Sequence, residues 1–119
     1  MTAQLERTWT AICGYDQLLP ERGVAALIDD RQVAVFRTFE GVLHAIDNRD
    51  PFTGACVLSR GIVGSRGDAP TVASPLHKQV FDLRTGECVT DAAVRVVVHG
   101  VRVRDGVVEV RLQSGEAVT

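Results

Sequence analysis

Apolar and polar residues alternate along much of this chain with the two-residue period of β-strands. Strands are predicted at Val24–Ile28 and Gln32–Arg37, on either side of the turn-forming pair Asp29-Asp30. A third strand is predicted at Val42–Ile46, and an earlier one at Thr8–Cys13. The first half of the chain is therefore typical of an antiparallel meander.

The C-terminal part of the chain predicts a second hairpin. The strands Val94–Arg104 and Val107–Leu112 flank Asp105-Gly106, a dipeptide that adopts positive φ at low cost. In the last strand every second residue is valine or leucine, so one face is expected to be buried and the other wet. The alternation shifts phase within Val94–Arg104, which predicts a bulge around Gly100.

The strand pattern breaks at Asp47–Pro70, which is rich in glycine and proline, and again at Ser74–Gln79, just after a short predicted strand at Thr71–Ala73. Long irregular segments in compact domains are usually functional or disordered. One helical turn is predicted at Tyr15–Leu19. We therefore predict a mostly β, antiparallel sandwich or partial barrel, with a loop-rich part over about residues 47–85.

Length and charge narrow the class of protein. The 119 residues suit one domain, residues 1–119. A formal net charge of −2 and a pI of about 5.9 give no electrostatic signature of a nucleic-acid or anionic-membrane binder. No apolar run approaches the roughly 20 residues that span a bilayer. The first residues lack the pattern of a signal peptide, so we expect a cytoplasmic protein.

The three cysteines, Cys13, Cys56 and Cys88, are widely spaced and form no CxxC pair. A structural zinc site needs paired ligands on tight turns, so this spacing argues against one. We expect three reduced thiols that behave as small, mostly buried hydrophobic residues.

Two loop motifs stand in order along the chain. They are Asp50-Pro51-Phe52-Thr53-Gly54 and Ser74-Pro75-Leu76-His77, and the return Phe81-Asp82-Leu83-Arg84-Thr85-Gly86 follows them. They resemble the two loops of Rieske domains, Cys-Pro-His-x-Gly and Cys-Pro-x-His, which are followed by Phe-Asp-x-x-x-Gly. The resemblance extends from Trp9 to Leu112 and implies a Rieske-like fold.

The resemblance also shows which cluster ligands have changed. It puts Asp50 and Ser74 at the thiolate positions, and Phe52 and His77 at the imidazole positions. A Rieske [2Fe–2S] cluster needs two thiolates on one iron and two imidazoles on the other. Phenylalanine cannot bind a metal, and a serine hydroxyl is a poor substitute for a thiolate. We therefore expect no metal site at these four positions.

The stretch Asp50–Gly64, together with 72–79, resembles the small subunit of NAD(P)H-dependent nitrite reductase. That resemblance implies an accessory chain which binds and stabilises, or regulates, a large catalytic subunit. The large subunit would carry FAD, a [4Fe–4S] cluster and sirohaem, and would reduce nitrite to ammonia. Gly61, Gly64 and Gly67 lack the GxGxxG order of a dinucleotide-binding loop, so no catalytic site or bound cofactor is expected in this chain.

Two alternatives to this function remain open at the level of the sequence. One is an electron-transfer protein with an unusual [2Fe–2S] ligation, and the other is a Rieske-like binding module of a different oxidoreductase. His77 itself has two interpretations: a functional residue, either a remnant cluster ligand or a polar contact at a subunit interface, or a loop histidine satisfied by a nearby carbonyl.

The loop tips also allow two packing arrangements. Phe52 could pack between the tips with Pro51, Pro75 and Leu76, where its burial would contribute about 2 kcal/mol. Alternatively Phe52 and Leu76 could stay exposed as an apolar patch for the large subunit. The candidate partner-binding residues are Phe52, Leu76, His77 and Lys78.

Overall fold

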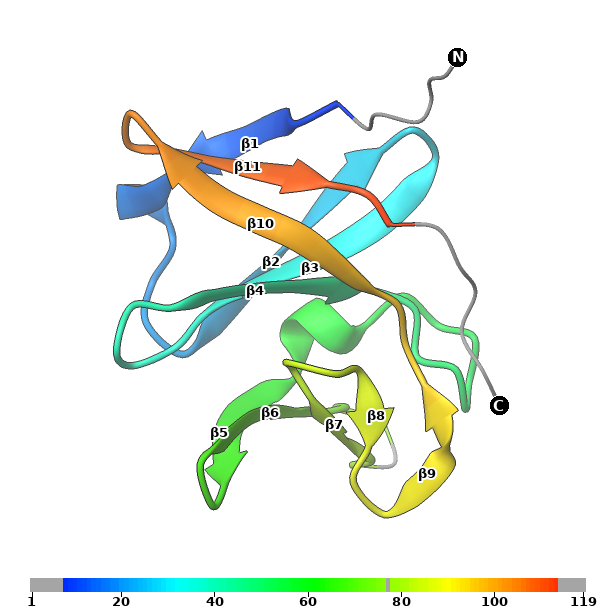
Figure 1. The fold of residues 1–119 in the computed structure, drawn as a ribbon. Helices are drawn as coiled ribbons and strands as arrows, with labels where there is room; N and C mark the ends of the chain where they lie inside the picture. Colours follow the sequence, from blue (N-terminus) through cyan, green and yellow to red (C-terminus); the bar gives the residue numbers. More distant parts are fainter. Residues whose placement is uncertain (1–7, 77, 114–119) are drawn as a thin grey trace.

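The computed structural model describes residues 8–76 and 78–113, and within them the chain forms two antiparallel sheets (Figure 1). The strands and 3-10 turns are β1 (Thr10–Gly14), η1 (Tyr15–Gln17), β2 (Arg22–Ile28), β3 (Arg31–Arg37), β4 (Leu43–Asp47), η2 (Leu58–Arg60), β5 (Ile62–Arg66), β6 (Ala69–Ala73), β7 (Val80–Asp82), β8 (Glu87–Cys88), β9 (Asp91–Arg95), β10 (Val98–Arg104) and β11 (Val107–Arg111). The strand order is β1-β11-β10-β4-β3-β2 in the first sheet and β5-β6-β7-β8-β9 in the second. The two described ranges contain no helix that could span a membrane.

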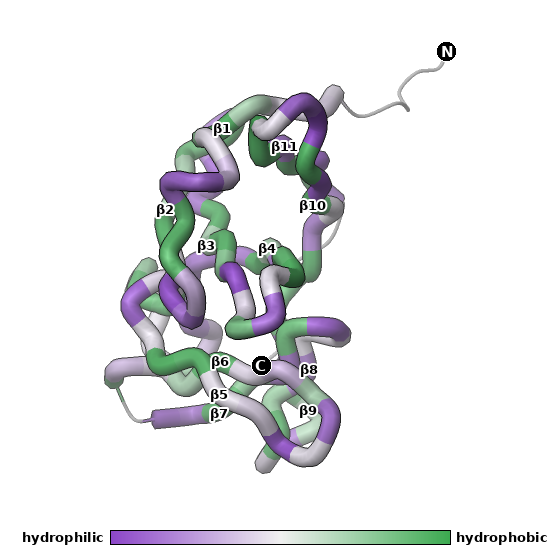
Figure 2. The backbone as a smooth tube through the Cα atoms, turned by 90° about the vertical axis from the view of Figure 1, so that its left-hand side faces the viewer, coloured by the Kyte–Doolittle hydropathy of each residue, from purple (hydrophilic) through white to green (hydrophobic). Residues whose placement is uncertain are grey.

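The first sheet curls into a nearly closed barrel, which Figure 2 shows end-on. The predicted hairpin turns are confirmed, because Asp29, Asp30, Asp105 and Gly106 all have the positive φ that such tight turns require. The barrel interior is filled by apolar side chains from β2, β3, β4 and β11 and from the segment after η1. They are Leu18, Ile28, Val33, Val35, Ala45, Val108 and Val110.

Strand β3 is buried on both faces. Val33 and Val35 point into the barrel, whereas Ala34 and Phe36 belong to a second core that lies between the barrel and the second sheet. This second core therefore fixes the second sheet against the outside of the barrel. Its buried members are Ala34, Phe36, Ile46, Leu58, Val72, Phe81, Leu83, Cys88, Val94 and Val96.

The prediction of one strand over Val94–Arg104 is wrong. The chain forms β9 in the second sheet, leaves it at Val96 and enters the barrel as β10. The phase shift arises because Val94 and Val96 pack in the core between the sheets, while Val101 packs against the barrel interior. The predicted bulge at Gly100 is also wrong, since Gly100 pairs with Arg111 in a regular register.

The segment Asp47–Pro70 contains more regular structure than its composition predicts. It holds η2 and most of the hairpin formed by β5 and β6. Strand β5 lies at the edge of its sheet and is mostly exposed, and only Val63 of this strand packs against the core, so the strand shows no alternating pattern. A bulge occurs in β1 instead, where the pairing with β11 shifts between Ala11 and Cys13.

Candidate functional site

The structure brings the two predicted thiolate positions into direct contact. Asp50 lies in the loop between β4 and η2, and Ser74 lies in the loop between β6 and β7. Their exposed fractions are 0% and 1%. The Ser74 hydroxyl Oγ donates a hydrogen bond to Asp50 Oδ2 at 2.6 Å. We name this buried pair the Asp50–Ser74 clamp.

Each member of the clamp also holds the backbone of its own loop. Asp50 Oδ1 accepts the N–H of Phe52 at 2.9 Å, and Ser74 Oγ accepts the N–H of Leu76 at 3.3 Å. The Gly54 N–H donates to the Asp50 carbonyl at 2.7 Å, and Gly54 has a φ of 80° that favours glycine. The clamp therefore shapes both loop tips as well as joining them.

Two apolar side chains flank the clamp without being fully covered. Phe52 is 38% exposed, and its ring lies 6.2 Å from that of the buried Phe81, centroid to centroid. Leu76 is 40% exposed, and Pro75 and Lys78 are exposed beside it. Phe52 is therefore neither fully buried nor fully exposed, because one part of its ring packs near Phe81 and another part faces outward.

We name Phe52, Pro75, Leu76 and Lys78 the loop-tip patch. The fourth vestigial cluster position and remaining candidate contact, His77, lies outside the described residues.

These residues do not fit the [2Fe–2S] cluster that a Rieske-like fold implies. The cluster requires soft thiolates on one iron. At those positions Asp50 and Ser74 offer oxygen atoms instead. These oxygens already make hydrogen bonds with each other and with loop N–H groups. Phe52 offers no ligand atom at an imidazole position. No reaction step of this chain is therefore assigned to a cluster.

Asn48 ties the first loop to the barrel, a role that no motif or spacing in the sequence indicates. It is buried, and its side-chain oxygen accepts the N–H of Ser59 at 2.7 Å. Its amide nitrogen donates to Gln32 Oε1 at 3.1 Å and to the carbonyl of Cys56 at 3.3 Å. Asn48 thus holds both ends of the loop that carries Asp50.

A second polar cluster lies where β4 meets β10. Asp47 accepts hydrogen bonds from Arg31 Nη2 at 2.8 and 3.0 Å, and its Oδ1 lies 2.7 Å from Nε2 of the buried His99. The N–H of Gln113 donates to His99 Nδ1 at 2.9 Å, so the ring proton sits on Nε2 and is donated to Asp47. Burial alone would raise the pKa of Asp47, but the bond from His99 and the charge of Arg31 lower it overall.

The chain reverses direction after β7 in a compact turn. Asp82 Oδ1 accepts the N–H of Arg84 at 2.7 Å, and the Asp82 carbonyl accepts the N–H of Gly86 at 2.7 Å. Burial raises the pKa of Asp82, but its bonds with Arg84 outweigh that effect and lower it. Gly86 has a φ of 82°, and a Cβ there would lie 2.1 Å from the carbonyl oxygen of Val96. The turn therefore requires glycine, which accounts for the Phe-Asp-x-x-x-Gly pattern.

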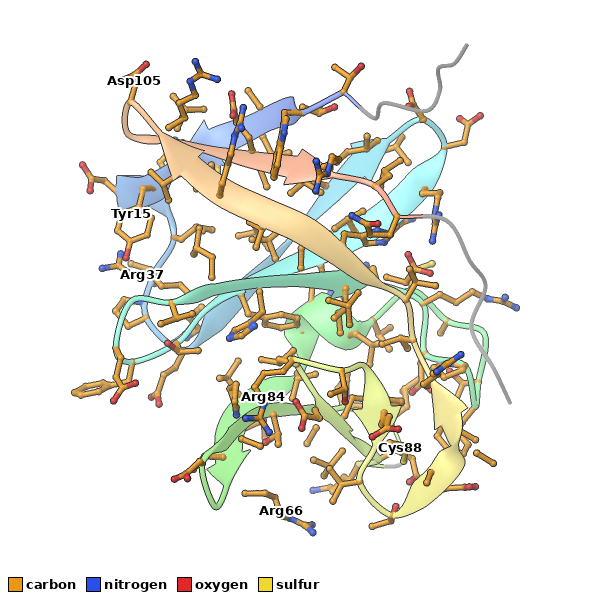
Figure 3. All side chains as sticks on the ribbon, viewed as in Figure 1. Tyr15, Arg37, Arg66, Arg84, Cys88 and Asp105 are labelled. Atoms are coloured by element: carbon orange, nitrogen blue, oxygen red, sulfur yellow. The ribbon has the colours of Figure 1, made fainter. Side chains whose placement is uncertain are left out.

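A cleft of about 650 Å³ lies between the β3–β4 turn and the β5–β6 hairpin. In Figure 1 this turn is on the left, whereas the loop after β4 is on the right. His44 and Arg84 line the cleft; Figure 3 shows Arg84 between the two sheets and Arg66 at the far end of the second sheet. Burial lowers the pKa of His44. The cleft is also lined by the apolar residues Phe39, Val42 and Val63 and by the acidic residues Glu21, Glu40 and Asp68.

The cysteines differ in their surroundings, so the expectation that they are mostly buried is wrong for one of them. Cys88 is buried in the core between the sheets, Cys13 is half-buried and Cys56 is exposed. All three are free thiols. Burial raises the pKa of the Cys13 thiol. Across residues 8–76 and 78–113, no three His, Cys, Asp or Glu side chains group as a metal site.

Comparison with known proteins identifies the family. Residues 8–111 match the family of the Rieske-like [2Fe-2S] domain. The chain is 46% identical over 104 residues to the nitrite reductase (NADH) small subunit of Escherichia coli strain K12, a match that covers 87% of this chain and 96% of that protein. The chain belongs to the nitrite reductase small subunits. The predicted family and mostly β fold are confirmed.

Two further relatives support the small-subunit assignment. The NMR structure of the E. coli protein NirD matches the chain with a TM-score of 0.84 and 44% identity, over 92% of this chain and 100% of that one. The nitrite reductase [NAD(P)H] large subunit of Klebsiella oxytoca contains a 108-residue stretch that is 40% identical to this small subunit. That stretch covers 91% of the small subunit but 11% of the large-subunit protein.

Proposed function

We propose that this small subunit binds the large subunit of an NAD(P)H-dependent nitrite reductase in the cytoplasm, where it acts as an accessory chain. It stabilises or regulates the subunit that reduces nitrite to ammonia. The FAD, [4Fe–4S] cluster and sirohaem of that reaction are assigned to the large subunit. One observation carries the proposal: in the Klebsiella oxytoca protein, a stretch similar to this small subunit lies within the large subunit's own chain.

The loop-tip patch is the proposed docking surface. Phe52 and Leu76 expose apolar surface, and their backbones are fixed by hydrogen bonds to the clamp. Apolar side chains on a preorganised backbone lose little conformational freedom when a partner covers them, and so they favour tight binding. Lys78 adds a positive charge at the rim of the same surface. His77 is included on the basis of its sequence position alone.

The other two functions considered from the sequence are less well supported. An electron-transfer role through a [2Fe–2S] cluster requires ligands that Asp50, Phe52 and Ser74 do not supply. A role in a different oxidoreductase would be consistent with the fold, and it becomes one of the outcomes of the test below.

The test is to express the tagged small subunit together with the large subunit from the same organism. We expect the large subunit to be retained and to oxidise NADH or NADPH when nitrite is added. The large subunit is also purified alone and titrated with the small subunit, which should raise its activity or its thermal stability. A large subunit that is fully active and stable alone, and that does not bind the small subunit, would contradict the proposal. Retention of a different oxidoreductase from the native cytoplasm would favour the alternative.

A further inference from the structure

The two loop tips are carried by separate parts of the fold. Asp50 follows β4 of the barrel, whereas Ser74 follows β6 of the second sheet. In a Rieske domain a metal cluster would join these loops. Here, among residues 8–76 and 78–113, the bond from Ser74 Oγ to Asp50 Oδ2 is the hydrogen bond that joins them.

We propose that the Asp50–Ser74 clamp replaces the cluster as a mechanical cross-link, and that it sets the spacing of the two loop tips that the large subunit binds. Asp50 and Ser74 are then positioning residues for docking. This inference rests on the proposed function, because it takes the loop-tip patch as the docking surface.

The bonding pattern supports this role. Both Asp50 oxygens are used, Oδ1 for the Phe52 N–H and Oδ2 for the Ser74 hydroxyl. Ser74 Oγ in turn accepts the Leu76 N–H. One continuous chain of hydrogen bonds therefore runs from the backbone of Phe52 to that of Leu76, and both side chains belong to the loop-tip patch. A change at either clamp residue displaces both halves of the docking surface.

Burial makes this chain of bonds strong and also costly to break. Neither clamp residue is exposed to water that could replace a lost partner. If this hydrogen bond were exposed, water molecules could replace either partner, and the bond would not hold the tips at one spacing. The ring contact between Phe52 and Phe81 supports the first loop, but it does not involve Leu76.

The chemistry of the clamp supplies a matched set of variants. Ser74→Ala removes the donor, and Asp50→Ala removes both acceptors. Asp50→Asn can keep the cross-link, because its oxygen can accept the Phe52 N–H while its amide donates to Ser74 Oγ. Ser65→Ala and Asp16→Ala alter exposed residues outside the clamp and serve as controls.

The experiment measures the affinity of each full-length variant for the purified large subunit, together with amide hydrogen exchange. We expect Ser74→Ala and Asp50→Ala to weaken binding by roughly ten-fold or more, because the two loop tips lose the cross-link that preorganises them for the large subunit. Exchange should rise in residues 50–56 and 74–79 and stay slow in the barrel. Asp50→Asn and both controls should bind within about three-fold of the unmodified chain, a difference of well under 1 kcal/mol.

The activity titration distinguishes a positioning role from a general loss of structure, because it measures the half-effect concentration and the plateau separately. The clamp variants should need more small subunit for half of the full effect on the large subunit, yet reach the same plateau.

Equal affinity despite faster loop exchange would overturn the inference, and so would an Asp50→Asn variant as weak as Asp50→Ala. If the unmodified small subunit does not bind at all, the proposed function itself fails. If one of the two alanine variants unfolds, its slow barrel exchange is lost, and the other alanine variant is then compared with Asp50→Asn.

Discussion

The polar cluster around Asp47 allows a stability prediction that can be worked out bond by bond. Asp47→Ala would leave the Nε2–H of His99, a fully buried ring, without an acceptor. It would also remove the pair of bonds from Arg31, whose side chain is 31% exposed. Asp47→Asn is milder, because its side-chain oxygen can still accept the proton of His99.

The size of the effect follows from the burial of each partner. An unsatisfied buried donor costs about 1–3 kcal/mol, and a partly exposed ion pair contributes about 0.2–1 kcal/mol. We therefore expect Asp47→Ala to lower the free energy of unfolding at pH 7 by roughly 1–4 kcal/mol. Asp47→Asn should lower it by about 1 kcal/mol, and the exposed Asp16→Ala by less than about 0.5 kcal/mol.

The pH dependence of this loss has a definite sign. The pKa of Asp47 is lower in the folded state than the value of about 3.9 for an unperturbed aspartate. Its contribution to stability is therefore complete above the unfolded pKa and is lost as the pH falls through the folded one. Urea unfolding at pH 7, 5, 4 and 3 should show the gap between the unmodified chain and Asp47→Asn closing below about pH 4. A gap that stays constant over this range would contradict the stabilising role of the Asp47 carboxylate, as would an Asp47→Ala variant of unchanged stability at pH 7.

Two further predictions follow from the core and the turns. Gly86→Ala should lower the free energy of unfolding by roughly 2–4 kcal/mol, because its Cβ would clash with the Val96 carbonyl at a positive φ; a near-normal midpoint in urea would contradict this. In the native protein a thiol reagent should modify Cys56 first and Cys88 only after unfolding, as followed by peptide mass spectrometry. Equal rates at the two thiols would show that the core around Cys88 opens readily.

Much of the fold could be predicted because its signals are local. Turn residues such as Asp29-Asp30 and Asp105-Gly106 favour the positive φ of tight hairpin turns through their own side chains and backbones, and the structure has the expected hairpins there. The crossing at Val96 could not be predicted in this way. A valine in a strand pattern indicates burial, but it does not show whether the burial lies inside the barrel or between the sheets.

In the candidate site, too, the sequence identifies some of the residues but not the contacts between them. Resemblance to Rieske loops identified Asp50 and Ser74 as corresponding positions, but the bond between them depends on how two loops 24 residues apart approach each other. Asp47 and His99 are separated by 52 residues, so no local spacing indicates their contact. Asn48 follows a strand, as many loop residues do, and its role depends on the buried groups that surround it.

A charge placed on the loop-tip patch shows whether the large subunit docks there. Leu76→Asp should weaken binding of the small subunit to the purified large subunit by at least about ten-fold, since an unpaired charge would be covered at the interface. Leu19→Asp places the same charge at a 60% exposed leucine outside the patch, and it should bind normally. Equal binding by both variants, or a loss confined to Leu19→Asp, would show that the large subunit docks elsewhere.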